Sequence, residues 1–170
     1  MDLKAFIREI PDFPTKGILF KDITPLVKSP EAFHQTIDAF EDAVRGIDFD
    51  TIVGIEARGF LFAAPLALKL GRPLVPVRKE GKLPSDTHSV PYSLEYGSNT
   101  LEVHTDAIHP GQRALIVDDL LATGGTLEAT ASLVEACGGE VAALAVVIEL
   151  TDLGGRARIA PHKVLSLVEY

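Results

Sequence analysis

The hydrophobic positions of this chain follow two alternating patterns. Short apolar runs bounded by polar residues or turns predict buried strands. Between several of them lie longer stretches whose apolar residues recur every three or four positions, which is typical of helices. The predicted strands cover residues 51–55, 73–77, 114–118, 141–150 and 163–168.

Local signals place the ends of three predicted helices. Ser29 followed by Pro30 is a typical helix start, and Gly46 closes the helical spacing that follows it. The other two predicted helices cover residues 59–70 and 126–137, and a glycine follows each of them. All three are long enough to cross back over a sheet.

The remaining segments carry weaker signals. Residues 2–10 predict a short helix, and the proline-rich residues 11–25 predict an ordered, extended arm. Residues 79–91 are polar and predict a loop. Residues 92–96 and 100–105 then predict a hairpin, because two short runs of strand-forming residues flank a Gly-Ser-Asn turn.

Strands that alternate with helices of this length predict an α/β fold with a mostly parallel central sheet flanked by helices. Near-continuous Val, Ile and Leu runs fit strands that are covered on both faces. In such sheets ligands bind beyond the carboxyl ends of the strands. Asp118 ends one predicted strand and Asp119 follows it, so the sequence places both at such an end.

Composition narrows the class of protein. The 170 residues fit a single domain, residues 1–170. A net charge of -8 argues against nucleic acid as a partner, because phosphate backbones require clustered Lys and Arg. No apolar run approaches the ~20 residues of a membrane span. The single cysteine, Cys137, cannot form an intramolecular disulfide and fits a reducing compartment, so we expect a cytoplasmic protein.

The stretch "ALIVDDLLATGGTLEA", residues 114–129, carries the most specific chemistry. A small-residue turn leads from the strand into the next helix, where free backbone N–H groups and the helix dipole favour an anion. The turn consists of Ala122, Thr123, Gly124, Gly125 and Thr126. Two carboxylates beside such a turn suit a ribose 5-phosphate, with the phosphate in the turn and the sugar hydroxyls on Asp118 and Asp119.

The string "VDDLLATGGT" resembles the phosphoribosyl-diphosphate-binding motif of the type I phosphoribosyltransferases. The strings "PDFPTKGILFKDITPL", "GIEARGFLFA", "VRKEGKLP", "YSLEYG" and "ELTDLGGRARIAP" are similar to the members that act on adenine, and follow their order. The resemblance implies the type I fold, with an N-terminal hood at about residues 1–28, a core at about 29–170 and a flexible lid at about 79–97. It also implies adenine and phosphoribosyl diphosphate as substrates.

The resemblance further implies roles for basic residues. The loop holding Ala57 and Arg58 would bind the diphosphate group, and its Glu56-Ala57 peptide bond is expected to be cis. The cations of "RKEGKLP" would reach the site of a neighbouring subunit, which makes a homodimer functionally necessary. These cations are Arg78, Lys79 and Lys82.

For the base, the resemblance implies that the ring of Phe20 stacks on it while backbone groups of Leu19 and Lys21 read its edge. Glu95 would exchange a proton with the base. Mg²⁺ is the expected cofactor, held mainly by the substrate and water, with Asp118 as a further ligand to consider. The five histidines show no metal-ligand spacing.

Three alternatives remain open from the residues. One is a different purine base, such as hypoxanthine or xanthine. Another is a transcriptional regulator that keeps the phosphoribosyl diphosphate site as a sensor, although a chain of 170 residues at -8 leaves little room for a DNA-binding surface. The third is a sugar-phosphate-binding protein that performs no chemistry.

Overall fold

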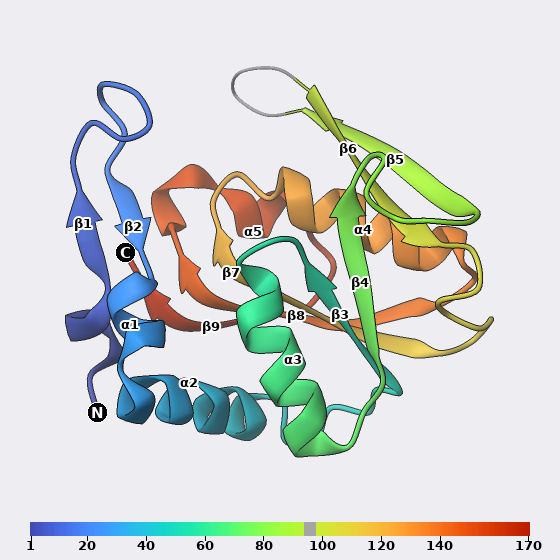
Figure 1. Cartoon of the computed structure of the whole chain (residues 1–170), viewed down its shortest axis with the longest axis horizontal. Helices are drawn as coiled ribbons and strands as arrows, with labels where there is room; N and C mark the ends of the chain where they lie inside the picture. Colours follow the sequence, from blue (N-terminus) through green and yellow to red (C-terminus); the bar gives the residue numbers. More distant parts are fainter. Residues whose placement is uncertain (94–97) are drawn as a thin grey trace.

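A seven-stranded sheet forms the centre of the molecule in the computed structural model, which describes residues 1–93 and 98–170 (Figure 1). The strand order across these residues is β5-β6-β4-β3-β7-β8-β9. The four pairings from β4 to β9 are parallel, whereas β6 pairs antiparallel with both β4 and β5. The predicted fold class is therefore confirmed. The strands are β3 (Thr51–Ile55), β4 (Leu74–Lys79), β5 (Thr87–Ser93), β6 (Ser98–His104), β7 (Arg113–Leu121), β8 (Glu140–Glu149) and β9 (Val164–Glu169).

Helices cover both faces of this sheet (Figure 1). They are α1 (Thr24–Lys28), α2 (Pro30–Ala43), α3 (Gly59–Leu70), α4 (Gly125–Ala136) and α5 (Gly155–Arg158), with 3-10 turns η1 (Leu3–Phe6) and η2 (Thr151–Leu153). Alternate residues of β7 enter different cores, as the two-residue period of a strand requires. Ala114 and Ile116 pack with α4, whereas Leu115 and Val117 pack with α2 and α3.

The sheet has a topological switch point between β3 and β7. The chain leaves β3 through α3 towards β4 on one side, and leaves β7 through α4 towards β8 on the other. In open α/β sheets a crevice forms at this point, beyond the carboxyl ends of the two strands. The loop after β3 and the turn after β7 therefore face each other here.

A two-stranded antiparallel sheet of β1 (Arg8–Ile10) and β2 (Phe20–Asp22) forms the hood, on the left in Figure 1. The prediction of a helix over residues 2–10 is wrong beyond Phe6. Residues 8–10 instead pair with β2, and this tertiary pairing overrides the weak helical signal. The extended arm ends earlier than predicted, because Phe20–Asp22 are extended as β2 but α1 begins at Thr24.

Two further boundaries differ from the prediction. Strand β7 continues through both aspartates to Leu121, because β8 pairs with it as far as Leu121–Glu149. The polar segment is not wholly a loop, because β5 begins at Thr87 and pairs with β6 from Thr87–His104 to Ser93–Ser98. Among the described residues, no helix combines the length and apolar character needed to cross a membrane.

Candidate active site

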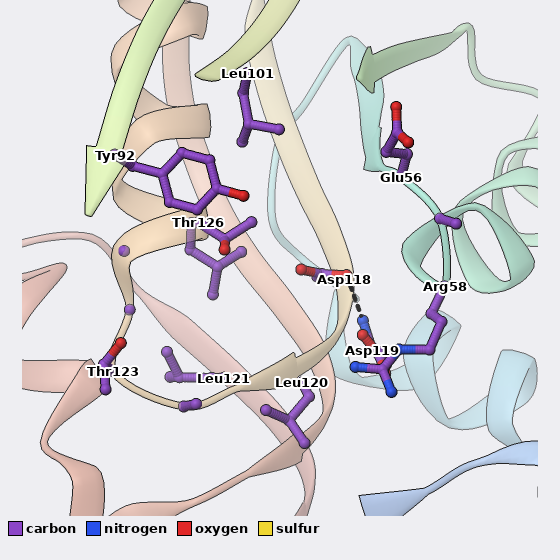
Figure 2. A pocket seen from close by; sticks show the side chains of 15 residues that line it. Glu56, Arg58, Tyr92, Leu101, Asp118, Asp119, Leu120, Leu121, Thr123 and Thr126 are labelled. Atoms are coloured by element: carbon purple, nitrogen blue, oxygen red, sulfur yellow. Dashed lines mark hydrogen bonds and ion pairs between the residues drawn. The ribbon is translucent and has the colours of Figure 1, made fainter. Parts of the chain in front are cut away.

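A cavity of about 240 Å³ lies at the carboxyl ends of β3 and β7, at the switch point (Figure 2). It opens there because β3 pairs with β7 only as far as Gly54–Val117, after which the chain turns into the Glu56–Arg58 loop. The cavity brings together the two predicted acids, the predicted phosphate-binding turn at residues 122–126 (the anion turn) and the predicted diphosphate-binding loop that holds Ala57 and Arg58. Its lining comprises Glu56, Ala57, Arg58, Tyr92, Leu101 and residues 118–127.

The two acids at this cavity are almost fully buried. Asp118 is 8% exposed and Asp119 is 3% exposed. The backbone N–H of Asp119 donates to Oδ1 of Asp118 at 2.9 Å. Gly59, at the start of α3, packs so closely that a Cβ there would lie 2.8 Å from Oδ1 of Asp118. A glycine at this position thus lets α3 begin directly against the carboxylate.

Burial shifts the ionisation of both acids. Burial, followed by the charge of Asp119, raises the pKa of Asp118 well above its ordinary value. Burial also raises the pKa of Asp119, although the Arg58 guanidinium opposes that change. The cavity therefore holds two carboxyl groups that are costly to ionise together, so a cation or hydroxyl donor bound there would stabilise their charged forms.

Arg58 joins the acids to the hood. Its Nε lies 2.9 Å from Oδ2 of Asp119, and its guanidinium carbon lies 5.2 Å from the centre of the Phe20 ring. The approach to Asp119 is poorly aligned, so Oδ2 has no hydrogen bond among the described residues. The peptide bond between Glu56 and Ala57 is cis, which confirms that prediction.

The anion turn has the backbone that its sequence predicts. Gly124 is the N-cap of α4, with a positive φ of 88° that favours glycine. It provides no side-chain cap, so the first N–H groups of α4 can bind a ligand. Figure 2 shows the Thr123 and Thr126 side chains at different points around this turn, with Tyr92 beside Thr126.

The segment from Leu150 to Arg158 packs against the anion turn at Ala122. The sequence predicted no helix or strand for this segment after Leu150. Its Gly154-Gly155 pair was the available signal. A Cβ on Gly155 would lie only 2.3 Å from the carbonyl oxygen of Ala122, so only glycine fits without a shift. Arg156 fixes the segment by donating to the buried Glu149 and to the carbonyl of Val164.

A second and more apolar cavity, of about 610 Å³, adjoins the first. The hood forms one wall and the segment after β8 forms another. Its lining comprises Pro14, Gly17, Ile18, Leu19, Phe20, Lys21, Arg58, Leu120, Ala122, Thr123, Leu150 and Leu153. Arg58, Leu120, Ala122 and Thr123 line both cavities, so the two form adjoining compartments. All three predicted base-binding residues therefore lie in one wall.

The Lys21 side chain is already occupied in this arrangement. It is 6% exposed, its ammonium pairs with Glu9, and it lies over the ring of Tyr170 at 3.5 Å from the centroid. A base contact from this ammonium would require breaking the pair. The geometry is thus compatible with backbone rather than side-chain recognition at Lys21.

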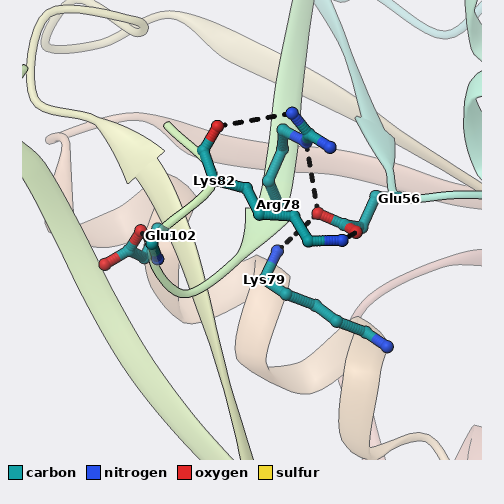
Figure 3. Close-up of polar contacts among 6 residues, drawn as sticks. Glu56, Arg78, Lys79, Lys82 and Glu102 are labelled. Carbon is teal, nitrogen blue, oxygen red and sulfur yellow. Dashed lines mark hydrogen bonds and ion pairs between the residues drawn. The ribbon is translucent and has the colours of Figure 1, made fainter. Parts of the chain in front are cut away.

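The predicted cation run lines neither cavity. Figure 3 shows its contacts with Glu56. The buried Glu56 accepts from Nε of Arg78 at 3.2 Å, the backbone N–H of Lys79 at 2.7 Å and Nζ of Lys82 at 2.9 Å. Burial alone would raise the pKa of Glu56, but the hydrogen bonds from Lys82 and Lys79 lower this pKa below its ordinary value. From the sequence, Glu56 was named only for its peptide bond and its side chain was assigned no role; its position two residues before Arg58 was the available signal.

A second acid fastens the same turn, because Glu102 accepts from the backbone N–H of Gly81 at 3.0 Å. Figure 3 shows the Lys79 side chain extending away from Glu56. Within this chain, then, two of the three predicted cations, Arg78 and Lys82, are paired with the single carboxylate of Glu56. Glu95, the predicted proton-transferring residue, lies outside the described residues.

Residues 24–167 match the phosphoribosyl transferase domain family. The chain is 56% identical over 170 residues to an adenine phosphoribosyltransferase of Carboxydothermus hydrogenoformans, covering 100% of both chains. It also superposes on the crystal structure of adenine phosphoribosyltransferase from Thermoanaerobacter pseudethanolicus, with a TM-score of 0.97, 54% identity and coverage of 99% and 98% of the two chains.

A third relative is the Saccharomyces cerevisiae adenine phosphoribosyltransferase, solved with D-2,5-dideoxy-2,5-imino-altritol 1,6-bisphosphate and adenine. It has a TM-score of 0.92 and 42% identity, with coverage of 98% of this chain and 96% of that one. The chain therefore belongs to the phosphoribosyltransferase family, and its full-length relatives place it among the adenine phosphoribosyltransferases. Both non-catalytic alternatives are set aside.

Substituting Asp118 by Asn should stabilise the fold while weakening sugar-phosphate binding. Asparagine keeps the acceptor for the Asp119 N–H but removes a buried carboxyl group that is costly to ionise, so we expect the free energy of unfolding at neutral pH to rise on the order of 1–3 kcal/mol. Denaturant titration measures this gain, and the exposed Asp106→Asn is the matched control.

The gain should shrink as the pH falls through the raised pKa of Asp118. As the pH falls, the folded wild type takes up a proton and no longer bears the cost of a buried charge. Conversely, the stability of the wild type decreases as the pH rises through that pKa. A less stable Asp118→Asn protein at neutral pH would show that the carboxylate charge supports the fold.

Proposed function

We propose that this protein transfers the 5-phosphoribosyl group of phosphoribosyl diphosphate to adenine, giving AMP and diphosphate in purine salvage. The observation that carries the proposal is the junction of two compartments at Arg58, one polar with an anion turn and one apolar beneath Phe20. A sugar phosphate suits the first compartment and a planar purine the second. The names of the full-length relatives support adenine as the base.

The polar compartment suits the sugar phosphate in one orientation. The 5-phosphate would bind the N–H groups and hydroxyls from Ala122 to Thr126, where the α4 dipole favours negative charge. The ribose hydroxyls would donate to Asp118 and Asp119. The diphosphate would then lie towards the backbone of Ala57 and the guanidinium of Arg58, which can bind it in a bidentate manner.

The reaction forms a bond from N9 of adenine to C1′ of the ribose as the bond from C1′ to the diphosphate oxygen breaks. The electron pair of the broken bond leaves with diphosphate, and the N9 proton leaves the base. Positive charge develops on the sugar in a ribocation-like transition state, so the adjacent acids would stabilise it. Arg58 would stabilise the growing charge of the leaving group.

On the basis of the family resemblance, we propose that Glu95 accepts the N9 proton. A carboxylate placed beside the base can accept that proton as the C1′–N9 bond forms. Because Glu95 lies outside the described residues, its assignment rests on its position in "YSLEYG" and not on geometry. The ring of Phe20 would hold the base by stacking, with Leu19 and Lys21 reading its edge through backbone groups.

The residues present fit Mg²⁺ that is held mainly by the substrate and water, with one or two carboxylates from the protein. Within residues 1–93 and 98–170 no group of three or more His, Cys, Asp or Glu residues could hold a metal ion. Asp118 and Asp119 offer at most two neighbouring carboxylates, and Mg²⁺ commonly binds one or two of these together with substrate phosphates and water. When bound, it would neutralise charge on the diphosphate leaving group.

A homodimer is supported by the outer face of α3. The helix is apolar on all sides, with Lys69 as its only charged residue, and such helices are normally covered. Leu61 and Leu68 are nevertheless exposed, Leu68 by 86%, and the nearby Leu74 of β4 is exposed too. A second copy of the chain would cover this surface. The cytoplasmic location expected from the single cysteine stays a prediction.

A purified sample offered phosphoribosyl diphosphate, Mg²⁺ and each purine base in turn tests the function directly. We expect adenine to be converted to AMP with release of one diphosphate, and hypoxanthine, xanthine and guanine to react at least ~100-fold less efficiently, because a site built to pair with polar groups rejects analogues that leave them unpaired. Omitting Mg²⁺ should abolish the reaction. Equal use of hypoxanthine would contradict the proposed specificity.

Glu95→Gln and Thr126→Ala should separate chemistry from binding. The glutamine variant loses the proton acceptor, so its single-turnover rate should fall by about 10²–10⁴-fold with little change in phosphoribosyl diphosphate affinity. Thr126→Ala should mainly weaken that affinity, by about 1.5–3 kcal/mol for a lost charge-assisted hydrogen bond. A wild-type single-turnover rate in Glu95→Gln would assign the proton to another group.

Leu68→Glu should yield a monomer. A carboxylate at the centre of an apolar contact would be buried without a partner, which disfavours association. Light scattering should show half the wild-type mass, with weaker phosphoribosyl diphosphate binding if the partner's cations complete the site. Ala136→Glu, at an exposed position of α4, is the control. A wild type that is monomeric and fully active would refute the dimer.

A further inference from the structure

The hood depends on side chains for its position over the core. Across the described residues β1 and β2 pair only with each other, so no strand pairing joins the hood to the central sheet. Yet Leu19 and Phe20 of this unit form one wall of the apolar compartment. Whatever fixes β2 relative to the core therefore fixes the width of the compartment.

Lys21, the residue after Phe20, makes such a contact. Its buried ammonium pairs with Glu9 on β1 and lies 3.5 Å from the centroid of the Tyr170 ring. An ammonium removed from water is strongly attracted to an aromatic face. Figure 1 shows the end of β9, which precedes Tyr170, beside β2. The contact thus joins segments that are far apart in the sequence.

Tyr170 is in turn bonded to the opposite wall of the compartment. Its carbonyl accepts from the backbone N–H of Thr151 at 3.0 Å and from the Thr151 hydroxyl at 2.7 Å. Its own N–H donates to the carbonyl of Glu149 at 3.0 Å. Thr151 lies between Leu150 and Leu153, which line the apolar compartment. One residue therefore links the hood wall to the core wall.

We propose that the side chains of Lys21 and Tyr170 set the spacing between the two walls and thereby the affinity for the purine base, although neither side chain touches the base. The inference rests on the proposed function. It gives the Lys21 ammonium a role distinct from recognising the base edge. It also assigns a role in base binding to Tyr170, which lines neither described cavity.

Steady-state kinetics of four variants test the proposal. Tyr170→Leu and Lys21→Met should each raise KM for adenine about tenfold, the scale of a lost cation–π contact in a dry site. Their KM for phosphoribosyl diphosphate should stay within about twofold, because the anion turn is unaffected. Tyr170→Phe keeps the ring and should restore KM for adenine to within about twofold of wild type.

Lys4→Met is the matched control. Lys4 lies over the same ring at 4.1 Å and donates to the carbonyl of Glu169, but it belongs to η1 and lines neither cavity. It should leave KM for adenine unchanged even if it lowers the melting temperature. The double variant Lys21→Met/Tyr170→Leu should raise KM no further than either single variant, because both remove one contact.

An unchanged KM for adenine in both Lys21→Met and Tyr170→Leu would overturn the inference. So would an equal rise in Lys4→Met, since that result would mean general loosening of the hood. If Tyr170→Leu fails to fold, Lys21→Met and Tyr170→Phe still make the comparison. If the proposed function is wrong, the wild type itself will form no AMP from adenine. If only the present inference is wrong, the wild type will form AMP, and the variants either will not differ from it in KM for adenine or will share their rise with Lys4→Met.

Discussion

Two neighbouring buried carboxyl groups are the constraint on which the rest of the site depends. Asp118 and Asp119 lie where β7 loses β3 as a neighbour but keeps β8, so the chain is held rigidly on one edge and open on the other. Burying a carboxylate costs several kcal/mol unless partners compensate. Here compensation is partial, since both pKa values are raised and Oδ2 of Asp119 has no hydrogen bond among the described residues. The fold thus sustains an unfavourable arrangement that a bound sugar would relieve.

Close backbone approach gives the site its shape around these carboxyl groups. Gly59 brings α3 against Asp118, and Gly155 brings the segment after β8 against the carbonyl of Ala122. Ion pairs to buried acids hold the nearby loops, with Glu56 fixing the turn after β4 and Glu149 fixing the segment before β9. An acid therefore anchors each of these two segments, whereas close backbone packing supports the turn at Ala122.

Local signals predicted most of the core and the anion turn, because apolar periodicity and the Thr-Gly-Gly-Thr string act within a few residues. The errors came where distant partners decide. Residues 8–10 become a strand only because β2 lies beside them, and β7 extends past Asp118 only because β8 continues alongside it. Sequence spacing also does not reveal that Lys21 contacts Glu9 and Tyr170. Nor does it reveal that Glu56 pairs with the cation run.

Arg58 belongs to both compartments, since it reaches Asp119 on the polar side and the Phe20 ring on the apolar side. A ligand in either compartment would therefore meet the same guanidinium. If binding of the sugar diphosphate draws Arg58 away from either contact, the affinity for the base changes by some factor. Thermodynamic linkage then requires the base to change the affinity for the sugar diphosphate by the same factor. In that case a single side chain would make the two ligands reciprocal effectors of one another.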